Sequence, residues 1–370
     1  MYSTIVHLLD ARGQHSQQVD VLVIGGGVVG AAATLAVARR GRRVALVERS
    51  SLSVAHGSSA GRARIFAPAA YPDESYLEMG LRALERWREI EERSGEVLLR
   101  PTGALSRGEF AEREMPALQE AGVEAEFLSP GQAMRRFGVW MPDDAPLLHQ
   151  PDAGVIRADR ARSVLLRMAG VAGAELHQGE LVRLIAERDD AVQVDTDTSR
   201  WRCSWAIVAA GPWSGELLAG AGIEVQLSVS CQSVVYLGLE DQLATPVALM
   251  EFDGDEPYAC WDPERGLKAA LHARGPVVDP DDAPREVEQQ AIARVVDWVG
   301  ARFPGVAGGP TAVETCLYTN TPDERFILRR RGRIVVASAC NGQGFQFAPE
   351  TGDLLARLAL GSEERNEAKI

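Results

Sequence analysis

The feature that most constrains this chain is a glycine-rich turn between a buried strand and a helix near its start. The hexapeptide Gly25-Gly26-Gly27-Val28-Val29-Gly30 has the pattern GxGxxG, follows the apolar run Val19–Ile24, and opens an alanine-rich helix over Val28–Arg40. A second apolar strand, Arg43–Val47, completes a βαβ unit. Such a unit implies a parallel sheet with right-handed crossovers, so we expect an α/β chain with a Rossmann-like domain.

Each residue of this motif has a physical reason in a dinucleotide site. Gly25 allows the tight turn, Gly27 lets a pyrophosphate approach the backbone, and Gly30 allows the helix to pack closely on the strand. The N–H groups at Val28 and Val29 and the helix dipole favour phosphate. Glu48 ends the second strand, where an acid binds ribose hydroxyls. The alternative interpretation of the motif is a glycine turn that binds no ligand, and that of Glu48 is an acid that is simply solvated. The motif alone does not decide whether the dinucleotide is FAD or NAD(P).

Composition excludes several other classes of protein. The 370 residues suggest about two domains, and the net charge of −13 without a basic stripe argues against a nucleic-acid partner. Five dispersed cysteines with no CxxC pair argue against a disulfide framework or a metal site and favour a reducing compartment. The apolar patch Ile5–Leu9 is too short for a signal peptide or a membrane span. We expect a cytoplasmic protein without a membrane partner.

The order of predicted elements indicates two interleaved domains, the second rich in sheet. Residues 1–18 are expected to be a flexible extension. The cofactor domain is expected over 19–96, 151–223 and 313–370, and the substrate domain over 97–150 and 224–312. The predicted helices include Ala158–Ala172, Arg285–Phe303 and Phe345–Leu360, and the predicted strands include Trp201–Ala210 and Ser228–Leu237.

Two further segments carry candidate site residues. Gly57–Arg64 is rich in small residues and contains Arg62 and Arg64, so it could wrap a pyrophosphate; the alternative is a flexible basic loop. Lys268 stands inside the apolar strand Gly266–His272, where burying a charge is costly without a function. His272 falls on the same strand face as Lys268 and is expected in a pocket, with a structural histidine as the alternative.

Four separated segments resemble the monomeric sarcosine oxidase and N-methyltryptophan oxidase group of the D-amino acid oxidase-like flavoproteins. They are Asp20–Glu48, Gly57–Ile65, Gly266–His272 and Cys316–Gly344, and Ala209–Trp213 resembles the family's second cofactor strand and turn. Within the fourth segment, Cys316-Leu317-Tyr318-Thr319-Asn320-Thr321-Pro322-Asp323-Glu324 resembles the stretch whose cysteine carries the flavin through a thioether. Gly342-Gln343-Gly344-Phe345 follows it, as in that family.

The resemblance implies FAD, attached through Cys316, in a D-amino acid oxidase-like fold. The plain alternative for Cys316 is a buried small hydrophobe. The resemblance also places Lys268 beside the flavin, where it favours charge on oxygen as oxygen is reduced, and Arg64 near the flavin. Tyr258 and Tyr318 are candidate pocket walls, with core packing as their alternative. The implied cofactor-binding residues are Gly25, Gly27, Val28, Val29, Gly30, Glu48, Arg49, Ser58, Ser59, Arg62, Arg64, Val182, Gly211, Trp213, Cys316, Gly342, Gln343, Gly344, Phe345 and Gln346, and the implied catalytic residues are Lys268, Arg64, His272, Tyr318 and Tyr258.

The chain departs from the family at the two cations that bind a substrate carboxylate. Ala67 and Gln346 stand at those positions, and Arg62 is the candidate for a displaced cation. We therefore expect an oxidase that converts a secondary amine or amino-acid derivative other than sarcosine to an imine, with O2 reduced to H2O2. A biosynthetic tailoring step and a carrier-tethered substrate are compatible with this reading. The alternatives are an NAD(P)-dependent dehydrogenase and an FAD-binding protein without oxidase activity.

Overall fold

The structure is a computed structural model, and it describes residues 8–9, 15–54, 56–69, 74–239, 247–272, 275–283 and 288–361. The described residues fall into two compact units. The first unit draws on Met1–Ser59, Arg162–Ser228 and Thr319–Lys369, and the second on Ala60–Ala161 and Val229–Tyr318. Compared with the expected domains, the described parts of 60–96, 151–161 and 313–318 fall in the second unit instead of the cofactor domain, and 224–228 falls in the first unit.

The first unit is built on a nine-stranded sheet whose central strands are parallel. Val, Ile, Leu and Ala fill these central strands because both faces of the sheet are covered. Strand β13 pairs with both β2 and β20 in parallel, and β2 pairs in parallel with β3. The strands are β1 (Leu8–Leu9), β2 (His15–Ile24), β3 (Val44–Glu48), β10 (Glu175–Gln178), β11 (Val182–Arg188), β12 (Ala191–Thr196), β13 (Arg200–Val208), β19 (Ile327–Arg331) and β20 (Ile334–Ser338).

Strand β2 begins four residues earlier than the sequence predicts. Residues 15–18 were expected in a flexible extension, but Ser16, Gln17 and Gln18 pair with the start of β13, and Leu8 and Leu9 pair with β2. The first four residues of β2, His-Ser-Gln-Gln, are polar and show no apolar pattern, so the sequence did not predict a strand there. Backbone pairing with β13 does not require apolar side chains. The rest of the expected extension, 1–7 and 10–14, lies outside the described residues.

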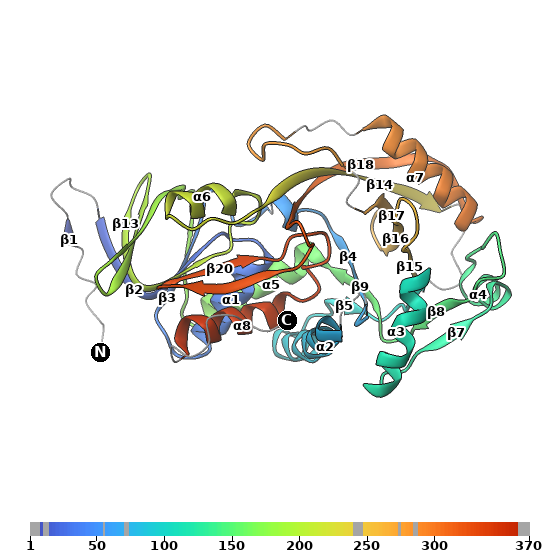
Figure 1. The fold of residues 1–370 in the computed structure, drawn as a ribbon, viewed down its shortest axis with the longest axis horizontal. Helices are drawn as coiled ribbons and strands as arrows, with labels where there is room; N and C mark the ends of the chain where they lie inside the picture. The colour runs from blue at the N-terminus through green and yellow to red at the C-terminus, as the bar shows by residue number, and fades with distance from the viewer. Residues whose placement is uncertain are drawn as a thin grey trace. The chain divides into compact units, whose positions relative to one another are not determined.

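Helices lie on both sides of this sheet, with α1 (Val28–Ala38) and α8 (Ala348–Leu360) drawn below the strands in Figure 1 and α6 (Ser214–Gly220) above them. A Cβ at Gly352 of α8 would lie 2.5 Å from the backbone of Ala32, so a glycine is needed where α8 meets α1. The unit also holds the short helices η1 (Gly57–Ser59) and η2 (Gly211–Trp213) and most of α5 (Ala158–Val171).

Replacement of Gly30 by alanine is expected to destabilise the first unit by roughly 1–3 kcal/mol or more. A Cβ at Gly30 would lie 1.9 Å from the carbonyl oxygen of Gly25, so the helix or the turn would have to move. The thermal unfolding midpoint measures the effect. Gly220→Ala is the control, because a Cβ there meets no atom within 4 Å. Equal midpoints for the two variants would contradict this prediction.

The second unit is sheet-rich, as its sequence suggests. Its main sheet has the order β18-β14-β17-β16-β15-β6-β8-β7, and a three-stranded sheet has the order β4-β9-β5. Helix α7 packs Ile292, Val295 and Val299 into the core of the main sheet. The elements are β4 (Ala63–Phe66), β5 (Leu99–Arg100), β6 (Ala104–Arg107), β7 (Glu126–Leu128), β8 (Leu147–Gln150), β9 (Gly154–Arg157), β14 (Ser228–Leu239), β15 (Ala248–Glu251), β16 (Pro257–Asp262), β17 (Gly266–Leu271), β18 (Val306–Asn320), α2 (Glu74–Ser94), α3 (Glu109–Glu120), α4 (Pro130–Phe137) and α7 (Gln289–Arg302).

The predicted fold class, a mixed α/β chain with a Rossmann-like unit and a sheet-rich unit, is confirmed. None of the helices in the described ranges has the length and apolar character needed to cross a bilayer.

Candidate cofactor and active site

In the first unit, the predicted cofactor residues gather at the carboxyl ends of the parallel strands. Gly25 follows β2, Glu48 ends β3, Gly211 comes three residues after β13, and Gly342 comes four residues after β20. Two contacts show that these ends meet: Ala209 donates its N–H to the Ile24 carbonyl at 2.9 Å, and a Cβ at Gly211 would lie 3.9 Å from the Cys340 sulfur. This edge is where open α/β sheets bind their ligands.

In the glycine turn, the backbone of Gly25 lies so close to the backbone of Ala209 that there is no room for a side chain at position 25. Gly25 has φ +107°, and a Cβ there would lie 2.4 Å from the Ala209 carbonyl oxygen. Gly27 caps α1 and has no side chain that could accept a hydrogen bond from the first N–H groups of the helix. Val28 donates its N–H to the Ser59 hydroxyl at 3.0 Å. The predicted residues Val28 and Ser59 therefore lie together at the helix N-terminus.

Glu48 is tied to the turn by its carboxylate. Its two oxygens accept the N–H groups of Gly26, at 2.7 Å, and Ser50, at 2.9 Å. A carboxylate has about four acceptor positions, so each oxygen retains capacity for a ribose hydroxyl. These two hydrogen bonds fix the orientation of the Glu48 carboxylate, which the sequence analysis predicted to bind ribose.

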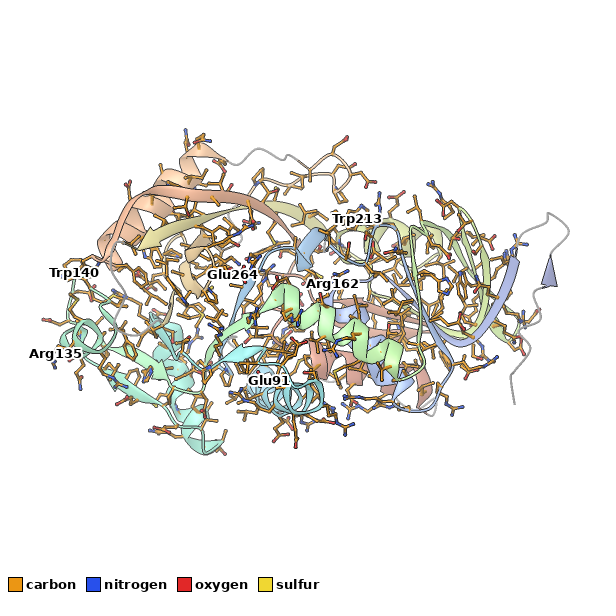
Figure 2. The ribbon with its side chains drawn as sticks, turned by 180° about the vertical axis from the view of Figure 1, so that it is seen from behind. Glu91, Arg135, Trp140, Arg162, Trp213 and Glu264 are labelled. Atoms are coloured by element: carbon orange, nitrogen blue, oxygen red, sulfur yellow. The ribbon has the colours of Figure 1, made fainter. Side chains whose placement is uncertain are left out.

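Arg49 and Trp213 form a second contact in this unit. The Arg49 guanidinium carbon lies 4.8 Å from the centre of the Trp213 ring, and a Cβ at Gly57 would approach that ring to 3.1 Å. Trp213 is labelled in Figure 2. The loop after β3 and the turn after β13 are therefore in contact. Of the other predicted cofactor residues here, Ser58 lies in η1, and Val182 is buried at the start of β11.

The segment before α8 has the features of a turn built around a ligand. Gly342 has φ +93°, and a Cβ at Gly344 would lie 1.5 Å from the Ala339 carbonyl oxygen. The side-chain oxygen of Gln343 is buried and, within the described residues, has no hydrogen-bond partner. An orphaned buried acceptor is costly, so a donor from a bound group would relieve it. Phe345 and Gln346 are buried in the same turn.

In the second unit, the structure brings the two candidate cations Lys268 and Arg64 onto one carbonyl. Lys268, on β17, is 3% exposed and donates from Nζ to the Ala63 carbonyl at 2.8 Å. Arg64, on β4, donates from Nη1 to the same oxygen at 3.0 Å. Burial, and secondly the charge of Arg64, lower the pKa of Lys268 to about 8. Two neighbouring cations at one neutral acceptor form a site that favours negative charge.

Cys316 lies beside these cations. Its sulfur is 3.8 Å from Nη2 of Arg64, and the side chain is half-buried on β18. Cys316 also packs against the apolar cluster of Val234, Tyr236 and Ala270, so it contacts both a cation and apolar side chains.

Three rings complete the group in the second unit. Tyr318 is hydrogen-bonded to Tyr258, and its ring centre lies 5.5 Å from that of His272. Burial raises the pKa of Tyr258 to about 12 and that of Tyr318 well above its ordinary value. Both phenols are therefore neutral at physiological pH and can donate or accept a hydrogen bond, but cannot serve as bases.

Arg62 is already matched by acids. Its Nε lies 3.6 Å from the Asp262 carboxylate, and its Nη2 pairs with Glu264. Asp262 is 2% exposed. Among the described residues neither Arg62 Nε nor Oδ2 of Asp262 has a hydrogen-bond partner, so Glu264 is the acid that pairs closely with this guanidinium and competes with any substrate carboxylate for it.

Ala67 lies in an apolar surrounding. It is fully buried and packs in a cluster with Ala104, Ala153, Met250 and Phe252. The position that carries an arginine in the resembling family is therefore filled here by small and apolar side chains.

One residue at the glycine turn escaped the sequence analysis. Arg162, on α5, is 3% exposed and donates from Nε to the Gly26 carbonyl at 2.7 Å. Two other arginines of the same helix, Arg160 and Arg167, are exposed, so no pattern in the sequence marks Arg162.

The fold and this site define a dinucleotide-binding α/β protein of the flavoprotein type. The chain belongs to the family described as FAD dependent oxidoreductase, whose model matches residues 20–358. The predicted resemblance is thereby confirmed, and the chain is an FAD-dependent oxidoreductase.

Individual relatives cover nearly the whole chain. It is 28% identical to monomeric sarcosine oxidase of Streptomyces avermitilis, over 92% of this chain and 93% of that protein. It is 27% identical to N-methyl-L-tryptophan oxidase of Salmonella enteritidis, over 92% and 95%. Among solved structures, an open form of a variant of NikD, an unusual amino acid oxidase essential for nikkomycin biosynthesis, matches with a TM-score of 0.85 and 25% identity over 96% of this chain and 98% of that chain.

Proposed function

We propose that this protein is an FAD-dependent oxidase that converts a secondary amine or an amino-acid derivative to an imine. The carbon next to nitrogen loses a hydride and the nitrogen loses a proton, and O2 takes up the two electrons and two protons to give H2O2. Bound FAD supplies the hydride acceptor. The observation that carries the proposal is the group of buried Lys268 with the half-buried Arg64 and Cys316 in the second unit. The names of the sarcosine and N-methyltryptophan oxidases support an amine as substrate.

The first unit would hold the dinucleotide. The N–H groups at the start of α1 and the Ser59 hydroxyl, which accepts the Val28 N–H in this structure, would bind the pyrophosphate, and Glu48 would accept hydrogen bonds from the ribose hydroxyls. Gln343 would receive a donor from the cofactor at its orphaned oxygen.

Lys268 would stabilise negative charge as oxygen is reduced. The chain has only two lysines, Lys268 and Lys369, against 37 arginines, since lysine and arginine together number 39. Almost all side-chain positive charges of this chain are arginines, but the cation in the middle of the buried strand β17 is a lysine, Lys268. Lysine is the cation whose pKa shifts readily on burial, whereas arginine stays charged.

The substrate would bind as a neutral amine, because a protonated nitrogen lacks the lone pair that drives hydride loss. Tyr258, Tyr318 and His272 would line its pocket, and no side chain need act as a strong base. Because Ala67 and Gln346 replace the expected cations, a substrate with a free carboxylate fits poorly. An uncharged amine, an esterified amino acid or a carrier-tethered one fits better, which suits a biosynthetic tailoring step. We expect the reaction to take place in the cytoplasm, without a nucleic-acid or membrane partner.

The covalent attachment of flavin to Cys316 tests the assignment most directly. We expect the purified protein to be yellow and the colour to stay with the chain after acid precipitation. Cys316→Ser should release its flavin to the supernatant, because serine cannot form the thioether. Cys340→Ser, a change at the other half-buried cysteine, should keep the flavin in the pellet. Wild-type protein that releases all its flavin would remove the covalent claim but not FAD binding.

A further inference from the structure

Arg162 is a buried arginine whose donors meet backbone carbonyls. Nε donates to the Gly26 carbonyl at 2.7 Å, and Nη1 donates to the Leu52 carbonyl at 3.1 Å. Throughout the part of the chain that the structure describes, no carboxylate is hydrogen-bonded to it. Burial lowers the pKa of Arg162, and the negative charge of Glu48 opposes that shift. Burying a guanidinium is costly, so its two directed bonds need an explanation.

The two bonds fall on the segments that flank the predicted phosphate site. Gly26 is the middle residue of the glycine turn, and Leu52 lies in the loop that follows β3. On its other side, Gly26 donates its N–H to Glu48 at 2.7 Å. Both polar groups of the Gly26 backbone are therefore held by charged side chains from distant parts of the sequence, one cation and one anion.

We propose that Arg162 is a positioning residue for the ADP half of FAD: together with Glu48 it clamps Gly26, so that the glycine turn is preset for the dinucleotide. Glycine is the residue with the most backbone freedom, and three glycines in a row leave the turn poorly defined by itself. A turn that is fixed before the ligand arrives does not lose conformational entropy on binding. Because the Gly26 carbonyl and the Gly27 N–H belong to one planar peptide unit, the bond from Arg162 also fixes the direction of the Gly27 N–H.

Helix α5 carries the clamp from outside the βαβ unit, as Figure 2 shows for the labelled Arg162 on the green helix. The residues around Arg162 on this helix, Ala161, Val164, Leu165 and Leu166, are buried and apolar. An apolar residue at position 162 would therefore satisfy packing, and the arginine is not required for the helix itself. Its polar bonds are specific to the turn.

The test uses the full chain in a Cys316→Ser background, where FAD binds reversibly and its Kd can be measured by fluorescence titration. Arg162→Met keeps an unbranched chain of similar length but removes the donors. We expect it to raise the Kd for FAD about ten- to a hundredfold, and the inhibition constant of ADP, measured by competition with FAD, by the same factor. Arg162→Lys should recover part of both. Arg167→Met, on the exposed side of the same helix, should change neither.

Three results would overturn the clamp. The first is an FAD Kd for Arg162→Met within twofold of the Cys316→Ser parent. The second is a loss of FAD affinity without a loss of ADP affinity, since the effect would then not act through the ADP half. The third is an Arg162→Lys variant as weak as Arg162→Met, which would indicate a packing defect. Should Arg162→Met not fold, as judged by thermal unfolding of the apoprotein, Arg162→Lys decides by its FAD and ADP constants. A parent that binds no FAD would instead refute the cofactor assignment itself.

Discussion

Lys268→Met is expected to slow reoxidation of the reduced flavin by oxygen by roughly two orders of magnitude, with a much smaller effect on reduction by substrate. Methionine fills a similar volume but carries no charge, so the site loses the ammonium that stabilises developing negative charge on oxygen. Arg64 remains, 3.0 Å from the same Ala63 carbonyl, and its charge would retain part of the stabilisation. Hydride transfer from substrate does not depend on that ammonium in the same way.

Stopped-flow measurement of the two half-reactions separates these effects. Bleaching of the flavin by substrate without oxygen reports reduction, and recovery of its absorbance on mixing with oxygen reports reoxidation. Lys268→Arg is the conservative control, because it keeps the charge but not the compact ammonium. Equal slowing of both half-reactions by Lys268→Met would count against a role in oxygen reduction.

The pH dependence of reoxidation follows from the pKa of Lys268, lowered to about 8 by burial and by Arg64. Protonated lysine is the form that attracts negative charge. The reoxidation rate should therefore be highest below about pH 8 and fall as pH rises through that value. The fall should be absent in Lys268→Met, which has no group to titrate there. A wild-type rate that rises with pH over this range would contradict the assignment.

The sequence predicted the first unit well, because its signals are local. The GxGxxG turn, the apolar runs before and after it, and Glu48 at the end of the second strand each follow from steric and hydrophobic requirements within about thirty residues. The polar start of β2 was missed, since pairing of Ser16 and Gln17 with β13 is a backbone interaction and leaves no hydrophobic pattern.

The site in the second unit was predictable only in part. Lys268 could be predicted as a site residue because a lysine is unusual in an apolar strand. Cys316 could be predicted because the segment around it resembles the flavin-carrying segment of the sarcosine oxidase group. That Arg64 and Lys268 share the Ala63 carbonyl depends on contact between β4 and β17, which lie about two hundred residues apart in the chain. Arg62, the candidate for a displaced cation, was conspicuous in the sequence, but its pairing with Glu264 and its approach to Asp262 were not predictable. Such long-range pairings leave no trace in one sequence.

Sarcosine is expected to be a very poor substrate relative to its own methyl ester. A free carboxylate needs cationic partners, and the two positions that supply them in the resembling family are Ala67 and Gln346 here. Each missing charge-assisted hydrogen bond is worth roughly 1.5–3 kcal/mol. Two of them would amount to roughly 3–6 kcal/mol, or about two to four decades in kcat/KM, if they were additive. Ligands of one carboxylate are coupled, so the two losses are not strictly additive.

The acid and its ester form a matched pair on the unaltered enzyme. They share the reacting C–H bond and the secondary amine and differ at the carboxyl group, so their kcat/KM ratio, compared at a pH where both amines are partly neutral, isolates the cost of the charge. Restoring an arginine at position 67 is a poorer test, because Ala67 is fully buried among Ala104, Ala153 and Met250 and a larger side chain would overpack that cluster. If sarcosine reacted as well as its ester, another cation would hold the carboxylate. Because Arg62 is already paired with Asp262 and Glu264, Arg64 would be the first residue to replace, and the proposed shift in substrate class would be wrong.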